Sequence, residues 1–189
     1  MEDMYINIQS KGKRTPIVSS KYCSSISPRR CFDESFNIIS IVGKLNYLEK
    51  GSRPDTSYAT HQLARFTTDP REEQGKATQW VARCLHEPKD KGLQMKPDPD
   101  KGLEVQIDAD FAGYYDFFDN SNPDTTKSRH GYVIFYSGIR ITWKSHLQTD
   151  IALRSTDAEY TGLSYSLQEA IPIINLLKKL KENKFNVND

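Results

Sequence analysis

The chain has 189 residues, of which 37% are hydrophobic and 11% are aromatic. This is enough apolar material for a lean core, and it argues against wholesale disorder. The formal net charge is +1, so no global field draws the chain onto nucleic acid, and any such contact has to come from local patches.

Residues 1–32 form a polar, basic lead-in with six Lys and Arg against two acids. The stretch "MYINI" within it is compatible with a short strand, and a poorly ordered segment is the alternative. No apolar run approaches the roughly 20 residues of a membrane span, and the N-terminus has no secretory h-region. The three cysteines Cys23, Cys31 and Cys84 are expected to be reduced thiols of an intracellular protein that is not secreted.

Residues 33–95 carry three helical patterns with short joints, which predict a compact helical unit. The first, "DESFNIISIVGKLNYLEK", is expected to be capped by Asp33 or Ser35 and to end near Gly51. The second is "PDTSYATHQLARFTTDP" and the third is "PREEQGKATQWVARCLHEP", in which two Glu occupy the first turn, where the helix dipole favours them. The apolar stripe expected on the first helix consists of Phe36, Ile39, Val42, Leu45 and Leu48.

From residue 103 the apolar period switches to two, and three strands are predicted: "LEVQIDADFAG", "HGYVIFYS" and "IRITWKSHLQ". Ser137-Gly138 is a turn signal that pairs the second and third strands as a hairpin. A long helix follows, which Pro172 is expected to kink or split. The fold class is therefore α+β, or the front half of an α/β fold. The apolar stripe expected on the long helix consists of Ala158, Leu163, Leu167, Ala170, Ile174 and Leu177.

Two acids fall where separate elements can bring them together. Asp108 leaves the first strand, and Glu159 lies in the first turn of the long helix. Carboxylates from separate rigid elements are what two-metal phosphodiester hydrolysis needs, with the ions about 3.5–4 Å apart, and Mg²⁺ favours such oxygen ligands. Two structural alternatives remain open: Thr156 and Glu159 can form a capping box, and Asp108 and Asp110 can be solvated strand-end acids.

The stretches "IDADFAG", "SRHGYVIFYSG", "ITWKS" and "LRSTDAEYTGLSYSLQEA" resemble, in this order, the ribonuclease H domain of copia-type LTR retrotransposon Pol polyproteins. Upstream, "IVGKLNYLEKGSRPDTSYATHQLARFTTDP" resembles the segment that joins reverse transcriptase to that domain. The resemblance covers about residues 35–183. It implies a helical connection or thumb-like segment at 33–95 and a ribonuclease H-like domain at 103–189.

The resemblance also implies an activity and its requirements. These are cleavage of RNA in RNA–DNA hybrids, Mg²⁺ (or Mn²⁺) as cofactor, the rest of the Pol polyprotein as partner, and a cytoplasmic particle or the nucleus as location, with no membrane. Asp108 matches the first catalytic Asp and Glu159 the catalytic Glu, both as metal ligands, while Asp110 has no assigned role. Lys144 and Arg154 are expected either to meet phosphates of the hybrid or to be exposed cations.

The family pattern has two further Asp after the long helix. Asp189 is a weak candidate for one of them and the other has no candidate, so we expect an incomplete domain that is inactive alone. A non-catalytic remnant with weak nucleic-acid binding is the alternative. An ATPase of the actin and sugar-kinase fold is disfavoured because "AGYYDFFDNS" lacks a Gly-rich phosphate loop. The four histidines have no metal-ligand spacing and are interpreted as incidental: His61, His86, His130 and His146.

Overall fold

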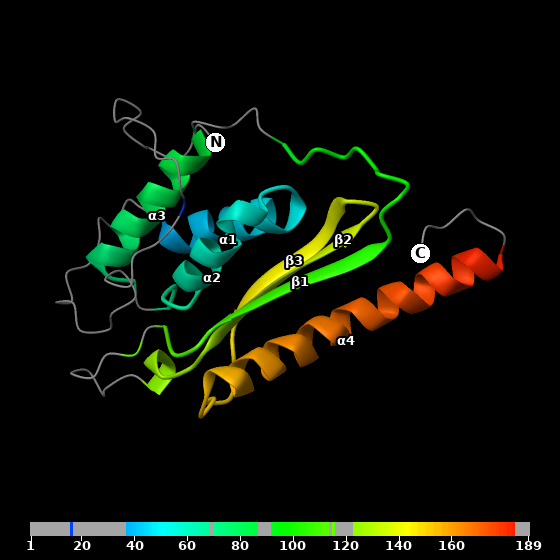
Figure 1. Ribbon diagram of the computed structural model, residues 1–189. Helices are drawn as coiled ribbons and strands as arrows, with labels where there is room; N and C mark the ends of the chain where they lie inside the picture. The colour runs from blue at the N-terminus through cyan, green and yellow to red at the C-terminus, as the bar shows by residue number, and fades with distance from the viewer. Residues whose placement is uncertain are drawn as a thin grey trace. The chain divides into compact units, whose positions relative to one another are not determined.

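The structure, a computed structural model, describes residue 16 and residues 37–68, 70–86, 92–113, 115 and 123–183. The chain divides into two compact units, Met1–Leu93 and Gln94–Asp189, which Figure 1 colours along the sequence. The expected lead-in, including "MYINI", lies outside the described residues except for Pro16, as do Cys23, Cys31 and Asp189. No helix within the described ranges has the length and apolar character needed to cross a bilayer.

The first unit begins with α1, which spans Ile38–Gly51. Its N-cap is Asn37, whose side-chain oxygen accepts a hydrogen bond from the Ser40 amide at 2.9 Å. The expected caps at Asp33 and Ser35 are therefore wrong, because the helix starts after both of them. The expected stripe is confirmed at Val42 and Leu45, which are buried, and wrong at Ile39, which is 63% exposed. Ile38 and Ile41 are buried in addition, and Phe36 lies outside the described residues.

A tight joint connects α1 to the next helix. It contains the short 3₁₀ helix η2 (Pro54–Thr56) and leads into α2 (Ser57–Ala64). The guanidinium of Arg53 donates from Nε and Nη2 to the two carboxylate oxygens of Asp55, at 2.9 and 2.7 Å. This forked pair holds the pKa of the Asp55 carboxyl below its usual range through the hydrogen bonds from Arg53.

The third helix, α3 (Glu72–His86), begins with Glu72 and Glu73 as expected. Its buried face includes Ala77, Val81 and Leu85, which recur at a spacing of four residues. Apolar residues from all three helices of this unit are buried: Ile38, Ile41, Val42, Leu45, Ala59, Leu63, Ala77, Val81, Ala82, Cys84 and Leu85.

The second unit contains a three-stranded antiparallel sheet and one long helix, which confirms the predicted α+β order. The strands are β1 (Leu103–Asp110), β2 (Arg129–Tyr136) and β3 (Ile139–Leu147), in the order β1-β2-β3. The short helix η3 (Pro123–Thr125) precedes β2. Ser137 and Gly138 have φ values of 50° and 76°, as a two-residue hairpin turn with both central residues left-handed requires.

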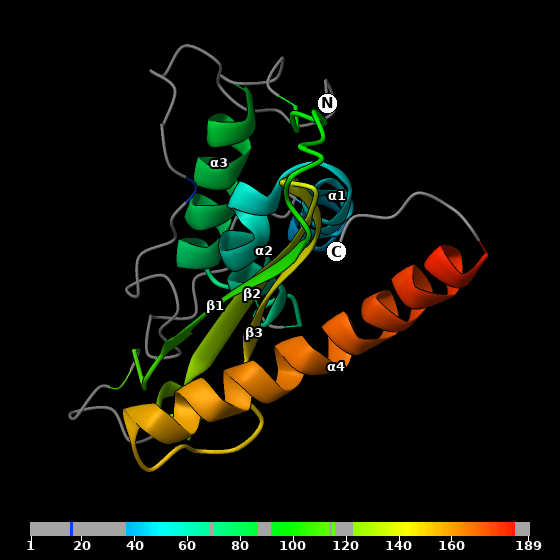
Figure 2. The ribbon, with the colours of Figure 1, turned by 45° about the vertical axis from the view of Figure 1, so that its right-hand side comes forward.

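Helix α4 (Ser155–Glu182) covers one face of this sheet. Figures 1 and 2 show it crossing the strands diagonally, with its C-terminal turns extending past them. Its core contacts join Ala170 to Tyr132 and Ile134 of β2, with Ile173 and the β1 residues Leu103, Val105 and Ile107 packed around them. Pro172 does not split the helix, which continues on both sides of it.

The face that α4 turns to the sheet is lined by small residues. Ala158, Gly162, Ser166 and Ala170 are buried, at a spacing of four, whereas the expected Leu163 and Leu167 are 40% and 44% exposed. A Cβ at Gly162 would lie 3.1 Å from the His130 Cβ, closer than two carbons normally approach. The predicted stripe is therefore confirmed at Ala158 and Ala170 and wrong at Leu163 and Leu167, because the helix lies too close to the strands for leucines to fit between them.

His130 of β2 is enclosed beneath α4. It is 2% exposed, and its ring stacks on Tyr165 of α4 with centroids 4.8 Å apart and planes 8° apart. Burial lowers the pKa of His130 to about 4, and the positive charges of His146, Lys144 and Arg129 act in the same direction. The neutral imidazole is therefore the form that this helix–sheet contact accommodates.

We expect Gly162→Val to lower the free energy of unfolding by about 1–3 kcal/mol, because its branched side chain must push α4 away from His130. Ser164→Val is the matched control, since Ser164 is exposed on the same helix, and it should change stability by less than about 0.5 kcal/mol. Urea unfolding followed by circular dichroism measures both. Equal effects of the two substitutions would contradict the close approach.

We also expect stability to fall as the pH drops from 6.5 to 4. In this window the unfolded chain protonates His130 near its ordinary pKa of 6.5, while the folded chain, with a pKa of about 4, does not. The unfolded state therefore binds more protons, and the loss amounts to at most about 1.4 kcal/mol per pH unit.

Comparison with His130→Asn isolates this contribution from that of the carboxyl groups. Unfolding free energies at several pH values should fall less steeply for the variant than for the parent chain. Parallel slopes would show that His130 does not carry the effect.

Candidate functional site

Asp108 lies near the end of β1, and the alternation of side chains along the strand decides which face of the sheet it points to. Ile107 belongs to the set that packs toward α4, so Asp108, the next residue, points to the opposite face of the sheet. Its side chain is exposed, and its partner in β2 is Gly131. The carboxylate is therefore accessible from solvent and has no bulky side chain directly opposite on β2.

Glu159 lies near the beginning of α4 and is also exposed. The helix starts at Ser155, with Arg154 as its N-cap, and within the described residues no side chain caps it. Thr156 is thus inside the helix, and the capping-box alternative is wrong because that motif needs Thr156 at the N-cap. The Glu159 carboxylate therefore has no capping role at the start of α4.

The turn of α4 that follows Glu159 packs against both β1 and β2. A Cβ at Gly162 would lie 3.1 Å from the Cβ atom of His130 and 3.6 Å from the Cγ2 atom of Ile107. Glu159 is three residues before Gly162, and Asp108 follows Ile107. Among the described strands β1 pairs only with β2. Glu159 therefore lies on the side of the sheet that α4 covers, whereas Asp108 points to the opposite face.

Each of the two side chains has the right chemistry for Mg²⁺, since carboxylate oxygens are its preferred protein ligands. In the part of the chain that the structure describes, no group of three or more His, Cys, Asp or Glu side chains is close enough to hold a metal ion. Asp110 does not add to the pair, because its carboxylate occupies the space above Gly113 in the turn after β1. Asp108 and Glu159 therefore suit Mg²⁺ only by the type of ligand atom that their carboxylates offer.

The two cations considered for phosphate contacts lie apart from each other in the fold. Lys144 of β3 faces α4, where its Nζ is 3.7 Å from a carboxylate oxygen of Glu169. Arg154 is exposed immediately before α4, next to the exposed Ser155. Of the two, Arg154 lies on the same end of α4 as Glu159.

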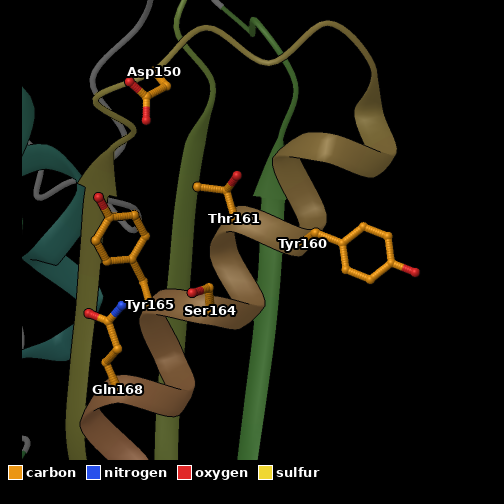
Figure 3. A pocket seen from close by; sticks show the side chains of 6 residues that line it. All are labelled: Asp150, Tyr160, Thr161, Ser164, Tyr165 and Gln168. Atoms are coloured by element: carbon orange, nitrogen blue, oxygen red, sulfur yellow. The ribbon is translucent and has the colours of Figure 1, made fainter.

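A shallow polar groove lies beside the first turns of α4, with a volume of about 500 Å³. Figure 3 shows Asp150 on the loop before the helix and Thr161, Ser164, Tyr165 and Gln168 on the helix, with Tyr160 directed to the other side. The Tyr165 hydroxyl is 3.5 Å from the Thr149 hydroxyl, so this ring links the groove to the buried His130.

The sequence reasoning missed the pairing of two histidines. His130 and His146 lie opposite each other in the β2–β3 ladder, with ring centroids 6.0 Å apart. The hairpin signal at Ser137-Gly138 predicts that the two strands pair, but counted from the turn alone it sets His130 opposite Ser145, because it does not reveal the extra residue in β3.

Comparison with known proteins gives relatives over most of the chain. The "Retrovirus-related Pol polyprotein from transposon RE1" of Arabidopsis thaliana is 31% identical over 173 residues, which are 92% of this chain and 11% of that protein. The corresponding polyprotein from transposon TNT 1-94 of Nicotiana tabacum is 33% identical over 75% of this chain and 10% of its own length. The chain thus spans about a tenth of the Pol polyproteins it matches.

One relative is of similar size to this chain. The "Secreted RxLR effector protein 161" of Plasmopara viticola is 32% identical over 133 residues, which are 70% of this chain and 88% of that protein. No family model matches, and no solved structure matches. The matches to several transposon polyproteins nevertheless agree with one another over most of the sequence. The chain is therefore a distant homologue, over most of its length, of copia-type retrotransposon Pol polyproteins.

Proposed function

We propose that the chain is the part of a Pol polyprotein in which the connection from reverse transcriptase meets ribonuclease H. Residues 33–95 would form the connection or thumb-like segment, and residues 103–189 the first part of a ribonuclease H-like domain. The substrate is RNA in an RNA–DNA hybrid, and the remaining parts of Pol are partners inside the cell. The homology to Pol polyproteins supports the origin of the chain, and the order of three antiparallel strands and a long helix supports the domain.

One observation carries the proposed activity. Asp108 and Glu159 come from two different rigid elements, β1 and α4, and the turn of α4 that follows Glu159 packs against Ile107, the residue before Asp108. These carboxylates would hold Mg²⁺, which in hydrolysis lowers the pKa of a bound water and stabilises the charge on the leaving oxygen. The sheet and α4 act by holding the two acids in fixed positions along the hybrid backbone.

The two acids do not make a complete two-metal site. An ion held by only two carboxylates keeps most of its waters and is bound weakly. A second ion needs further acids, which we assign to the rest of the Pol polyprotein. The cleaving form is therefore expected to be the chain joined to the following Pol segment.

A non-catalytic product is the second candidate. It is favoured by the match over 88% of a protein that bears the name of an effector and not of a polymerase or nuclease. In that case the chain would bind nucleic acid weakly through its exposed cations and would not cleave it with any extension.

The test measures hydrolysis of a fluorescently labelled RNA–DNA hybrid in Mg²⁺. We expect the 189-residue chain alone to leave the hybrid uncut, because it supplies two of the required acids. A C-terminal extension taken from a Pol relative that supplies the two further Asp should produce cleavage. Asp108→Asn or Glu159→Gln in the extended form should abolish it, because each removes a charged metal ligand.

Asp110→Asn in the extended form is the matched control, since Asp110 is exposed on the same face of β1 but lies against Gly113. It should retain cleavage. An extended chain that folds yet never cleaves would favour the non-catalytic candidate. Cleavage that survives Asp108→Asn would remove Asp108 from the site.

A further inference from the structure

The hairpin contains a pair of imidazoles that the proposed nuclease function does not use. His130 and His146 are directly opposed across β2 and β3, on the face that α4 covers. Their ring centroids are 6.0 Å apart and their planes differ by 34°. Directly opposed residues have Cβ atoms about 4.5–5.5 Å apart, which allows two imidazoles to reach one ion between them.

The ring of His146 lies against the backbone carbonyl of the next residue, and a hydrogen bond there favours one tautomer. Its Nδ1 atom lies 2.5 Å from the carbonyl oxygen of Leu147. A carbonyl oxygen can only accept, so Nδ1 carries the proton in the neutral ring and the lone pair is on Nε2. Histidines that bind metals usually donate their other ring N–H in this way, which orients the ring and raises its basicity.

The His130 ring has a buried nitrogen that the protein does not satisfy. Its Nδ1 has no hydrogen-bond partner among the described residues, although the side chain is 2% exposed. An unmade hydrogen bond of this kind costs stability unless another group compensates for it. Stacking on Tyr165 fixes the plane of the ring, and the neutral form that burial favours keeps a lone pair on one of its nitrogens.

We propose that His130 and His146 chelate a divalent transition-metal ion, of the class of Zn²⁺, Ni²⁺ or Cu²⁺, between β2 and β3. Two neutral imidazoles suit these ions and do not suit Mg²⁺, which prefers oxygen. His146 is only partly buried and gives the ion access from solvent, with waters completing the coordination. The nearest cation on this face, Lys144, is compensated by Glu169 at 3.7 Å.

Because an ion bound at this pair would join β2 to β3 in the folded state only, it would stabilise the hairpin. It would also occupy the buried nitrogen of His130. The site is separate from Asp108 and Glu159, since Asp108 points to the other face of the sheet and the ligand chemistry is different.

The test is calorimetric titration of the full chain with Ni²⁺ at pH 7.5, in a background of Cys23→Ser and Cys31→Ser that removes competing thiols. We expect one ion per chain. His130→Asn and His146→Asn should each weaken binding at least about tenfold, which is about 1.4 kcal/mol. His86→Asn, at the exposed end of α3, is the matched control and should bind as the background chain does.

Thermal unfolding provides a second measurement that does not depend on His130→Asn folding well. Ni²⁺ should raise the unfolding midpoint of the background chain but not that of the His146→Asn variant. His146 is only partly buried, so this variant is expected to fold. Asp108→Asn and an excess of Mg²⁺ should leave the Ni²⁺ affinity unchanged. A folded background chain that binds no Ni²⁺, or a His146→Asn variant that binds it equally well, would overturn the proposal.

Discussion

The close contact between α4 and the sheet determines the positions of the functional candidates in the second unit. Gly162 allows it, since a side chain there would meet His130 and Ile107. The contact places Tyr165 on the His130 ring and brings the first turns of α4 onto β1 and β2. The position of Glu159 beside the sheet therefore depends on a residue that has no functional group. The small residues at a spacing of four on α4 therefore determine how closely the helix approaches the sheet.

The order of elements could be predicted from the sequence, because the change from a helical to a twofold apolar period is a local signal. The hairpin turn was equally readable, since few dipeptides tolerate two consecutive left-handed residues as Ser137-Gly138 do here. The faces of the helices were harder to predict. Leu163 and Leu167 were expected to face the sheet because they are the most apolar residues, but the distance between layers selects residues by size.

The pairing of His130 with His146 depends on an irregularity that no short sequence pattern reveals. The register of β2 and β3 shifts between Ile134 and Phe135, so Ile141 is an extra residue in β3. Without this bulge the tight turn would pair His130 with Ser145 and direct His146 to the other face. A single inserted residue thus decides whether the two imidazoles meet. The metal role proposed for Asp108 and Glu159 likewise rests on the family resemblance, since the described residues hold no group of three or more possible metal ligands.

The edge of β1 has a further consequence for how separate copies of the protein behave. Among the described strands it pairs on one side only, so it exposes a row of backbone donors and acceptors that a second copy could join. Four residues are exposed at alternate positions along it, and three of them are acids: Glu104, Gln106, Asp108 and Asp110. Two such edges brought together would set carboxylate against carboxylate, and this repulsion opposes intermolecular sheet formation. Neutralising the row, by acid or by substitution, would convert the same edge into a template for aggregation.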